Sequence, residues 1–327
     1  MMDRVKVYAR TLFAGFGFLY DLSRFVRYGG WRSSLRSVEA RNYYMVKLYH
    51  TLEKSLSFSH RKPGSGWAGA QALILALERS FMLHGIGCHD LLAISVLKKF
   101  ADAEQPHHPQ KTAWLLQRLL KVEAQCQQPV PFFQHSGALD YDRSAFDKGR
   151  LPAPEQFFLS RYSLREFSPV PIPVEELRRA LEMAMKAPSA CNRQAWHVYH
   201  LKGEMAQRAL AFQDGNRGFG HKIQDLLIIT SDLRAFVSPR ERYQHWIDGG
   251  MFAMSLILAL HALGIASCCL NWSQSGTADS RLRKAIKISA QHSVMMMLAI
   301  GYPNEQNRVC ASPRRPLHEI YTLLSAH

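Results

Sequence analysis

The chain has 327 residues, an apolar share of 47%, a charged share of 20% and a formal net charge of +15. This length allows one large or two modest domains, and the composition excludes a wholly disordered chain. The first 62 residues carry 12 Lys/Arg against 4 Asp/Glu, so about half of the excess charge lies there. Such an excess favours an anionic partner, or it is a solvated basic surface with no dedicated partner. No zinc-finger, RNA-recognition or basic-zipper pattern supports specific nucleic-acid binding.

The N-terminal run TLFAGFGFLY, residues 11–20, is too short to span a bilayer, and no signal-peptide cleavage site follows it. Apolar residues continue at helical spacing to residue 25, and we expect this stripe to pack against the rest of the protein. The alternative is a peripheral membrane contact through an interfacial helix in residues 1–30. The stripe consists of Leu12, Phe16, Leu19, Leu22 and Phe25.

The first half of the chain is predicted to be helical. Apolar residues recur at three- and four-residue spacing in four segments, which are residues 34–58, 68–84, 89–103 and 111–127. A proline-containing stretch without periodicity, residues 129–155, then predicts a linker or a wrapped loop. We therefore expect a helical N-terminal region, residues 1–150, and a second domain, residues 151–327.

In the second half, strands alternate with helices, which indicates an α/β or α+β layer structure. Residues 247–265 are apolar on every face, so this helix is expected within a core or a subunit interface. Asp248, His261 and two glycines argue against a membrane span there. The other predicted elements are a helix at 174–187 and strands at 196–201, 225–232, 266–272 and 293–303.

The cysteines do not form a disulfide framework, because no C-x-x-C is present and adjacent strand residues point to opposite faces. Reduced thiols in a cytoplasmic protein fit this pattern best. The six cysteines are Cys88, Cys126, Cys191, Cys268, Cys269 and Cys310.

Four separated motifs carry the candidate chemistry. Arg161, Ser163 and Arg165 alternate, so in an extended segment they share one face and could grip a phosphate; alone they could equally be a charged surface turn. The next three are APSACNRQAW at 187–196, the small-residue turn GIASCCLNW at 264–272, and GYP at 301–303 with Arg314 and Arg315 downstream.

In this order the motifs resemble the nitroreductase family of FMN-dependent oxidoreductases, over roughly residues 156–320. The resemblance implies an α+β sandwich around a central, mainly antiparallel sheet, preceded here by the all-α N-terminal region. It also implies an intertwined homodimer with FMN at the interface, in which helix 247–265 is the interface helix. The segments on which the resemblance rests are RYSLREF (161–167), APSACNRQAW (187–196), GIAS (264–267) and GYP (301–303) with Arg314.

The resemblance also assigns cofactor-binding roles. The phosphate and ribityl chain of FMN would be held by Arg161, Ser163, Arg165 and Arg314, with Tyr162 and Arg315 beside them. Five residues would approach the isoalloxazine ring, and they could belong to the second subunit of the dimer. They are Pro188, Ser189, Ala190, Asn192 and Gln194. The turn beside the ring would include Cys268, Cys269 and Leu270.

Two residues depart from the family pattern, and both put redox tuning and substrate preference in question. Ala195 stands where the family has proline, and Ala266 stands where it has the second glycine of the turn. Cys191 lies within the loop that is expected to face the redox cofactor.

The expected function is reduction of a small-molecule substrate by ping-pong hydride transfer from NADH or NADPH through FMN. The cofactor carries this chemistry, so no catalytic side chain and no metal site is assigned. Two alternatives stay open. One is a non-catalytic basic binding or scaffold protein on the same fold; the other is an FMN enzyme that catalyses dehydrogenation or flavin fragmentation.

The most motif-like part of the first half is residues 49–73. His50, Glu53 and Lys54 share a helix face there, and a Pro-Gly-Ser-Gly turn follows the basic run at 60–62. This stretch resembles segments fused to nitroreductase-like domains in bacterial polysaccharide gene neighbourhoods, which suggests a biosynthetic role. The region is either a structural helical extension or a cap over the flavin whose basic groups bind an anionic substrate.

Overall fold

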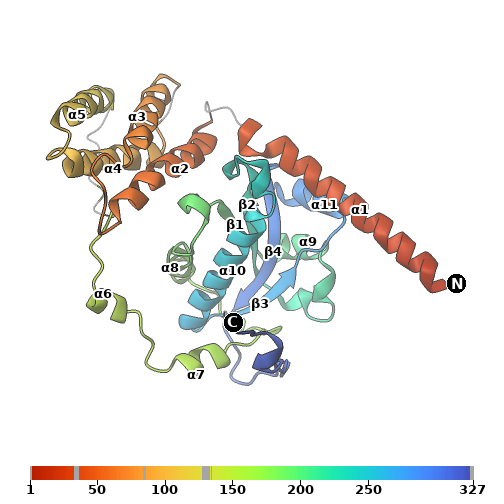
Figure 1. Cartoon of the computed structure of the whole chain (residues 1–327). Helices are drawn as coiled ribbons and strands as arrows, with labels where there is room; N and C mark the ends of the chain where they lie inside the picture. The colour runs from red at the N-terminus through yellow and green to blue at the C-terminus, as the bar shows by residue number, and fades with distance from the viewer. Residues whose placement is uncertain (1, 33–36, 84–85, 127–132, 134, 325–327) are drawn as a thin grey trace.

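The computed structural model describes residues 2–32, 37–83, 86–126, 133 and 135–324. Its centre is a four-stranded sheet in the order β1-β2-β4-β3, with every neighbouring pair antiparallel (Figure 1). The predicted strands and their order along the chain are confirmed. The strands are β1 (Trp196–Lys202), β2 (Asp225–Asp232), β3 (Ala266–Asn271) and β4 (His292–Gly301).

Helices cover both faces of this sheet, because alternate strand residues face opposite sides. Leu227 and Ile229 of β2 belong to the core under α8 (Val174–Ala184) and α10 (Gln244–Ala262). Leu226 and Ile228 belong to the core under α9 (Gly203–Leu210) and α11 (Gly276–Ile286). The central strands are therefore apolar on both faces, and the α+β fold with an antiparallel sheet is confirmed.

The long helix α10 explains why its sequence is apolar all round. One side is buried on the sheet and includes Phe252, Leu256 and Leu260. The opposite side carries Ile247 and Met254, which are 52% and 44% exposed, and a Cβ added at Gly250 would meet nothing within 4 Å. An exposed apolar stripe at this spacing is typical of a helix that packs on a second subunit.

The N-terminal region folds around its own core, and its helices match the predicted segments to within a few residues. The helix expected from residue 34 begins at Val38, after Ser37 accepts a capping hydrogen bond from the Ala40 N–H at 3.3 Å; residues 34–36 lie outside the described residues. The His50 Nδ1 and Glu53 Oε2 atoms lie 3.0 Å apart, as their spacing predicts. The helices are α2 (Val38–Leu56), α3 (Trp67–Met82), α4 (Cys88–Glu104) and α5 (Pro109–Glu123).

Polar contacts join this region to the sheet domain. Tyr43 of α2 donates to Asp232 at the end of β2, with an O–O distance of 3.2 Å. Arg234 donates to the same carboxylate at 2.7 Å and lies 3.8 Å from Glu39 of α2. Residue 37 and helix α2 thus lie against the end of β2, where Figure 1 shows α2 next to the β1–β2 side of the sheet.

Helix α1 (Met2–Tyr28) corrects one expectation. Its C-terminal part is fixed, because Tyr20 donates to Asp279 at 2.6 Å and Phe25 is buried. The rest of the predicted stripe faces outward: Leu12, Phe16 and Leu19 are 65%, 66% and 60% exposed. The prediction that the stripe packs against this chain is therefore wrong except at Phe25. Polar contacts near the C-terminal end of α1 fix the helix on the sheet domain.

The predicted linker at 129–155 lies partly outside the described residues. Its described part contains the short helix α6 (Arg143–Asp147) and leads into α7 (Pro154–Leu159). In the described part of the chain, no helix combines the length and apolar character needed to cross a membrane. Short 3₁₀ turns η1–η7 span Gly30–Arg32, Ala190–Asn192, Asp214–Asn216, Gly220–Lys222, Leu233–Ala235, Pro239–Glu241 and Leu317–Glu319.

Candidate functional site

The basic segment 161–165 lies along β3. Ser163 forms a parallel bridge with Ser267, and the Leu164 N–H donates to the Ser267 carbonyl at 3.1 Å. This pairing holds Ser163 against β3, and the chain bends at Arg165. Arg165 Nη1 donates to Cys310 Sγ at 3.2 Å, which brings the segment after β4 next to it.

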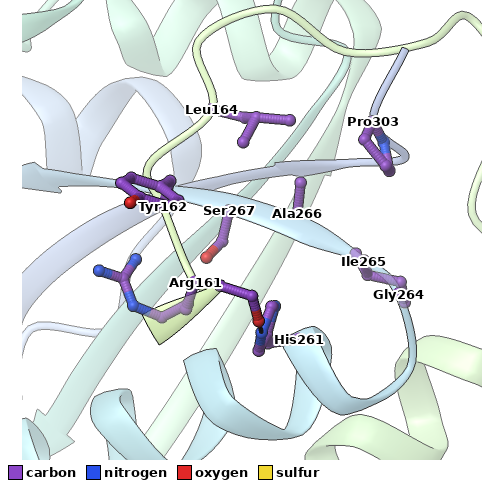
Figure 2. A pocket seen from close by; sticks show the side chains of 10 residues that line it. Arg161, Tyr162, Leu164, His261, Gly264, Ile265, Ala266, Ser267 and Pro303 are labelled. Atoms are coloured by element: carbon purple, nitrogen blue, oxygen red, sulfur yellow. Dashed lines mark hydrogen bonds between the residues drawn. The ribbon is translucent and has the colours of Figure 1, made fainter. Parts of the chain in front are cut away.

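A cavity of about 210 Å³ opens between this segment and the turn from α10 into β3. Arg161, Tyr162 and the turn 264–267 line it, and Figure 2 shows them around one hollow with His261 at its base. The His261 ring nitrogen Nε2 lies 3.0 Å from Ser160 Oγ and 3.1 Å from the Phe157 carbonyl. Sequence reasoning missed His261 as a site residue, because an isolated histidine on an apolar helix carries no motif.

The departure at Ala266 has a local explanation. The left-handed residue of the turn is Gly264, with φ of 73°, and the Ile265 N–H donates back to the Leu260 carbonyl at 2.9 Å to close the helix end. Ala266 is already in β3, where no glycine is required. On the same strand Cys268 is buried and Cys269 exposed, as strand alternation predicts. Burial raises the pKa of the Cys268 thiol, although Arg165 opposes the shift.

The polar loop 188–194 lies at the other end of α10. Three of its non-glycine residues have left-handed backbone conformations, which are Cys191, Asn192 and Gln194 with φ of 52°, 53° and 51°. Strain of this kind persists only where surrounding contacts impose it, and it concentrates at functional sites. The Ala190 N–H donates to the Asp248 carboxylate at 3.2 Å, and the Gln194 N–H donates to Ser189 Oγ at 3.0 Å.

Arg193 is the anchor of this loop and was not among the predicted site residues. Its side chain is fully buried and donates to Glu241 Oε1 at 2.6 Å and to the Ala190 carbonyl at 2.9 Å. Burial alone would raise the pKa of Glu241, but the hydrogen bonds and charge of Arg193 outweigh it and hold that pKa below its ordinary value. Ala195, where proline was expected, is completely buried and its carbonyl accepts from the Asp232 N–H at 2.7 Å.

The predicted site residues fall into two groups within one chain. Arg161, Tyr162 and the turn 264–267 line a cavity with His261, at the C-terminal end of α10, and Cys268–Leu270 follow that turn along β3. The loop 188–194 is bound to Asp248, near the N-terminal end of the same helix. At 1.5 Å per residue these ends are about 20 Å apart along the helix axis. A single chain therefore does not bring the two groups together.

Arg314 and Arg315 lie in the segment that follows β4, which is largely exposed through residue 324. The contacts they make are local: Arg314 Nη1 donates to the Ser312 carbonyl at 2.5 Å, and Arg315 lies 3.9 Å from Glu319. Within the described residues, no group of three or more His, Cys, Asp or Glu side chains is placed to hold a metal ion.

The basic segment beside the edge strand β3 and the polar loop 188–194 lie on one domain of the α+β class. Two overlapping segments, 159–214 and 203–302, match the model described as "Nitroreductase family". The C-terminal half of the chain therefore belongs to the nitroreductase family.

Curated relatives are similar over this half. A Thermus thermophilus protein named "NADH dehydrogenase" is 25% identical over 193 residues, which cover 50% of this chain and 91% of that protein. A Nocardioides protein named "4-nitrobenzoate reductase" is 22% identical, with 53% of this chain and 92% of that protein covered. A Vibrio harveyi protein named "NADPH-flavin oxidoreductase" is 20% identical, with 50% and 70% covered.

The similarity to solved structures covers about the same share of the chain. An FMN-dependent nitroreductase from Clostridium difficile is 21% identical with a TM-score of 0.42, covering 51% of this chain and 98% of that one. A nitroreductase family protein from Streptococcus pneumoniae is 20% identical with a TM-score of 0.45, covering 52% and 99%.

Proposed function

We propose that the protein is an FMN-dependent oxidoreductase that uses NADH or NADPH to reduce a small-molecule substrate. The observation that carries this proposal is the segment 161–165, which pairs with β3 at Ser163 and places Arg161 beside the cavity at the end of α10. The family match supports it, as do relatives named for NADH and for NADPH-flavin activity.

The residues present fit FMN. Arginine offers forked donors to phosphate oxygens, and Arg161 and Arg165 would hold the phosphate with Ser163 on the ribityl chain. Arg314, Arg315 and Tyr162 would complete this end, and Cys268, Cys269 and Leu270 would run beside the ring. The loop residues that would approach the ring are Pro188, Ser189, Ala190, Asn192 and Gln194.

When bound, FMN supplies hydride transfer between a nicotinamide and an acceptor, so the side chains need only bind, orient and shield. The anchoring of Ala190 by Asp248 and of Arg193 by Glu241 would fix the loop before the ring arrives. Preorganised donors of this kind cost no rearrangement at the moment of reaction. One open face of the ring would serve donor and acceptor in turn, which makes the proposed kinetics ping-pong.

We further propose a homodimer in which each flavin site takes its phosphate end from one chain and its loop 188–194 from the other. Support comes from the two groups of site residues, which lie at opposite ends of α10. The exposed stripe with Ile247 and Met254 offers an apolar surface for the contact. The segment after β4 adds exposed apolar side chains that a second chain would cover, including Leu317, Ile320 and Tyr321.

Other parts of the proposal rest on single features. The division into a helical region, residues 1–150, and an FMN-binding domain, residues 151–327, rests on the composition change and on the match that begins at 159. A cytoplasmic location rests on six free cysteines. A polysaccharide-related biosynthetic role rests on the segment 49–73. Peripheral membrane contact rests on the outward apolar side of α1.

The test is flavin content followed by anaerobic reduction of the full-length protein. Purified protein should be yellow, or should take up added FMN with a rise in melting temperature, and NADH or NADPH should bleach the flavin rapidly. Protein that neither contains nor binds FMN would contradict the proposal. Tight FMN binding without bleaching by either nicotinamide would instead favour an FMN enzyme with a different reaction, or a non-catalytic protein on this fold.

A further inference from the structure

A groove of about 860 Å³ lies between helix α1 and the segment that leads into helix α11. None of the residues proposed to bind the flavin is among the described residues that line it, so FMN chemistry gives this groove no role. One wall consists of Phe13, Phe16, Gly17 and Tyr20, and the other consists of residues 273–277 and Ser280.

Polar contacts hold α1 in place as one wall of the groove. Tyr20 donates to Asp279 Oδ2 at 2.6 Å, and Arg24 donates to the Ala290 carbonyl at 2.9 Å. A Cβ added at Gly276 would lie 2.6 Å from the Tyr20 ring, so the close approach here requires glycine. Residues later in α1 contact residues later in the α11 segment, and the two helices therefore run in roughly the same direction.

The wall formed by α1 is apolar and uncovered at the end of the groove nearer the N-terminus. Phe13 and Phe16 line the groove, yet they are 76% and 66% exposed. Leu12, Leu19 and Leu22 continue the exposed apolar surface around the outer side of the helix. A contiguous exposed apolar surface of this kind marks a contact with a membrane or with another protein.

Each helix carries a basic side chain at the later end of its groove face. On α1, the lining residues Phe16 and Tyr20 share one face with the exposed Arg27, at spacings of four and seven residues. On α11, the lining residue Ser280 shares a face with the exposed Lys284, four residues further on. Because the helices run in the same direction, both cations lie toward the same end of the groove.

Four exposed cations at or beside this basic end keep their full charge. Within the part of the chain that the structure describes, none of them forms an ion pair. The nearby carboxylates have other partners: Asp279 accepts from Arg283 Nε at 2.5 Å, and Asp21 interacts with Arg24. The four cations are Arg27, Arg281, Lys284 and Lys287.

We propose that this groove is a docking surface for anionic phospholipid in a bilayer. Phe13 and Phe16 enter among the acyl chains, and the basic end binds the headgroup phosphates. The surface fits an anionic amphiphile, because its apolar and cationic parts lie at opposite ends of one groove. A second copy of this chain fits less well, because two such grooves facing each other would bring like charges together.

The inference rests on the peripheral membrane contact proposed above, and it names the lipid class and the residues that recognise the headgroup. The full-length wild type should bind vesicles of phosphatidylcholine with about one third phosphatidylglycerol more tightly than phosphatidylcholine alone, and added salt should weaken this binding. Equal binding to both kinds of vesicle would overturn the inference and leave a purely apolar membrane contact.

Charge reversal at the basic end tests the assignment of residues. Lys284→Glu with Lys287→Glu leaves the apolar surface intact and should weaken binding to the anionic vesicles by about 30-fold or more. Lys284→Gln with Lys287→Gln serves if the reversed variant fails to fold. Unchanged binding in the folded variant would overturn the inference.

The matched control makes the same charge change elsewhere on the molecule. Arg79→Glu with Lys121→Glu alters exposed cations on α3 and α5, which Figure 1 shows on the opposite side of the protein from the N-terminal half of α1. It should bind the anionic vesicles within about twofold of the wild type. An equal loss in this control would mean that overall charge, and not the groove, attracts the lipid, and this would overturn the inference.

Flavin measurements on the same proteins separate this inference from the proposed oxidoreductase. Lys284→Glu with Lys287→Glu should keep the flavin content of the wild type and its bleaching by NADH or NADPH. Selective vesicle binding by a protein that takes up no FMN would contradict the proposed function alone. A mass by light scattering that falls from dimer to monomer in Phe13→Glu, with vesicle binding unchanged, would show that a second copy covers the groove and would overturn the inference.

Discussion

Arg193 and Glu241 form a two-point ion pair, with Nη2 2.6 Å from Oε1 and Nη1 3.1 Å from Oε2. The same guanidinium donates to the Ala235 carbonyl at 2.9 Å, so one buried side chain ties the loop 188–194 to two neighbouring turns. Each left-handed residue in the loop costs about 1 kcal/mol or more. These anchors offset that strain and keep the loop in one conformation.

Arg193→Met should therefore destabilise the protein by about 3 kcal/mol, because it leaves a largely buried carboxylate without its cation. The free energy of unfolding from urea denaturation measures this. Arg178→Met, which replaces an exposed arginine on α8, is the control and should change stability by no more than about 0.5 kcal/mol. Equal denaturation midpoints for the two variants would show that the Arg193 pair contributes nothing.

The same pair predicts a pH dependence of stability. The folded-state pKa of Glu241 lies below its ordinary value, so the pair contributes fully above the unfolded-state pKa of about 4.3 and its contribution is lost as the pH falls through the folded-state pKa. Glu241→Gln should be less stable than the wild type at pH 7, and the difference should shrink below pH of about 4. A difference that stays constant from neutral to acid pH would contradict the assignment.

Arg161→Ala should weaken FMN binding by about 10- to 100-fold, because it removes one or two charge-assisted hydrogen bonds to the phosphate. Arg314→Ala is predicted to act in the same direction. The readouts are flavin content after purification and the dissociation constant from quenching of FMN fluorescence. Arg178→Ala should retain wild-type affinity. Normal flavin content in Arg161→Ala would remove this residue from the proposed site.

Sequence patterns predicted the strands, most helices and the antiparallel layer structure, because alternation and helical spacing are local properties. The pairing of Ser163 with Ser267 was not predicted. What they missed depends on contacts between distant residues. The partnership of Arg193 with Glu241, the position of His261 by Arg161, and the groove that Phe16 shares with Ser280 have no spacing signature.

The side of α1 that docks was also mispredicted, for a physical reason. The apolar stripe indicates which side avoids water, but it does not say what covers that side. In the structure polar contacts fix the helix instead: Tyr20 donates to Asp279, and Arg24 donates to the Ala290 carbonyl at 2.9 Å. The apolar residues Leu12, Phe16 and Leu19 stay exposed in the single chain.

Mixed dimers test the proposed sharing of the flavin site. Arg161→Ala removes the phosphate end and Asn192→Ala removes a loop residue, so each homodimer should have two defective sites. A dimer with one chain of each kind has one site that carries both changes and one that carries neither. Coexpression with two affinity tags should therefore recover about half of the wild-type flavin and turnover per mixed dimer. Mixed dimers no better than either parent would show that each site is built from one chain.

The exposed stripe of α10 makes a further prediction about assembly. Met254→Lys places a charge in the proposed contact between subunits, on a side chain that is 44% exposed in one chain. Burying an unpaired charge opposes association, so the variant should be monomeric and depleted of FMN. Light scattering after gel filtration measures the mass. Dimers of unchanged stability would place the contact elsewhere.

The outward side of α1 predicts binding to anionic membranes. An interfacial helix buries apolar and aromatic side chains at the lipid boundary, and basic charge adds attraction to anionic lipid. The protein should cosediment with vesicles of phosphatidylcholine that contain about one third phosphatidylglycerol, and less with phosphatidylcholine alone. Phe16→Glu with Leu19→Glu should reduce binding by at least about 100-fold, since each buried side chain contributes about 1.5–3 kcal/mol. If the double variant still binds vesicles, the helix is not the membrane contact, and if it loses dimerisation instead, the stripe of α1 covers a second copy of the chain.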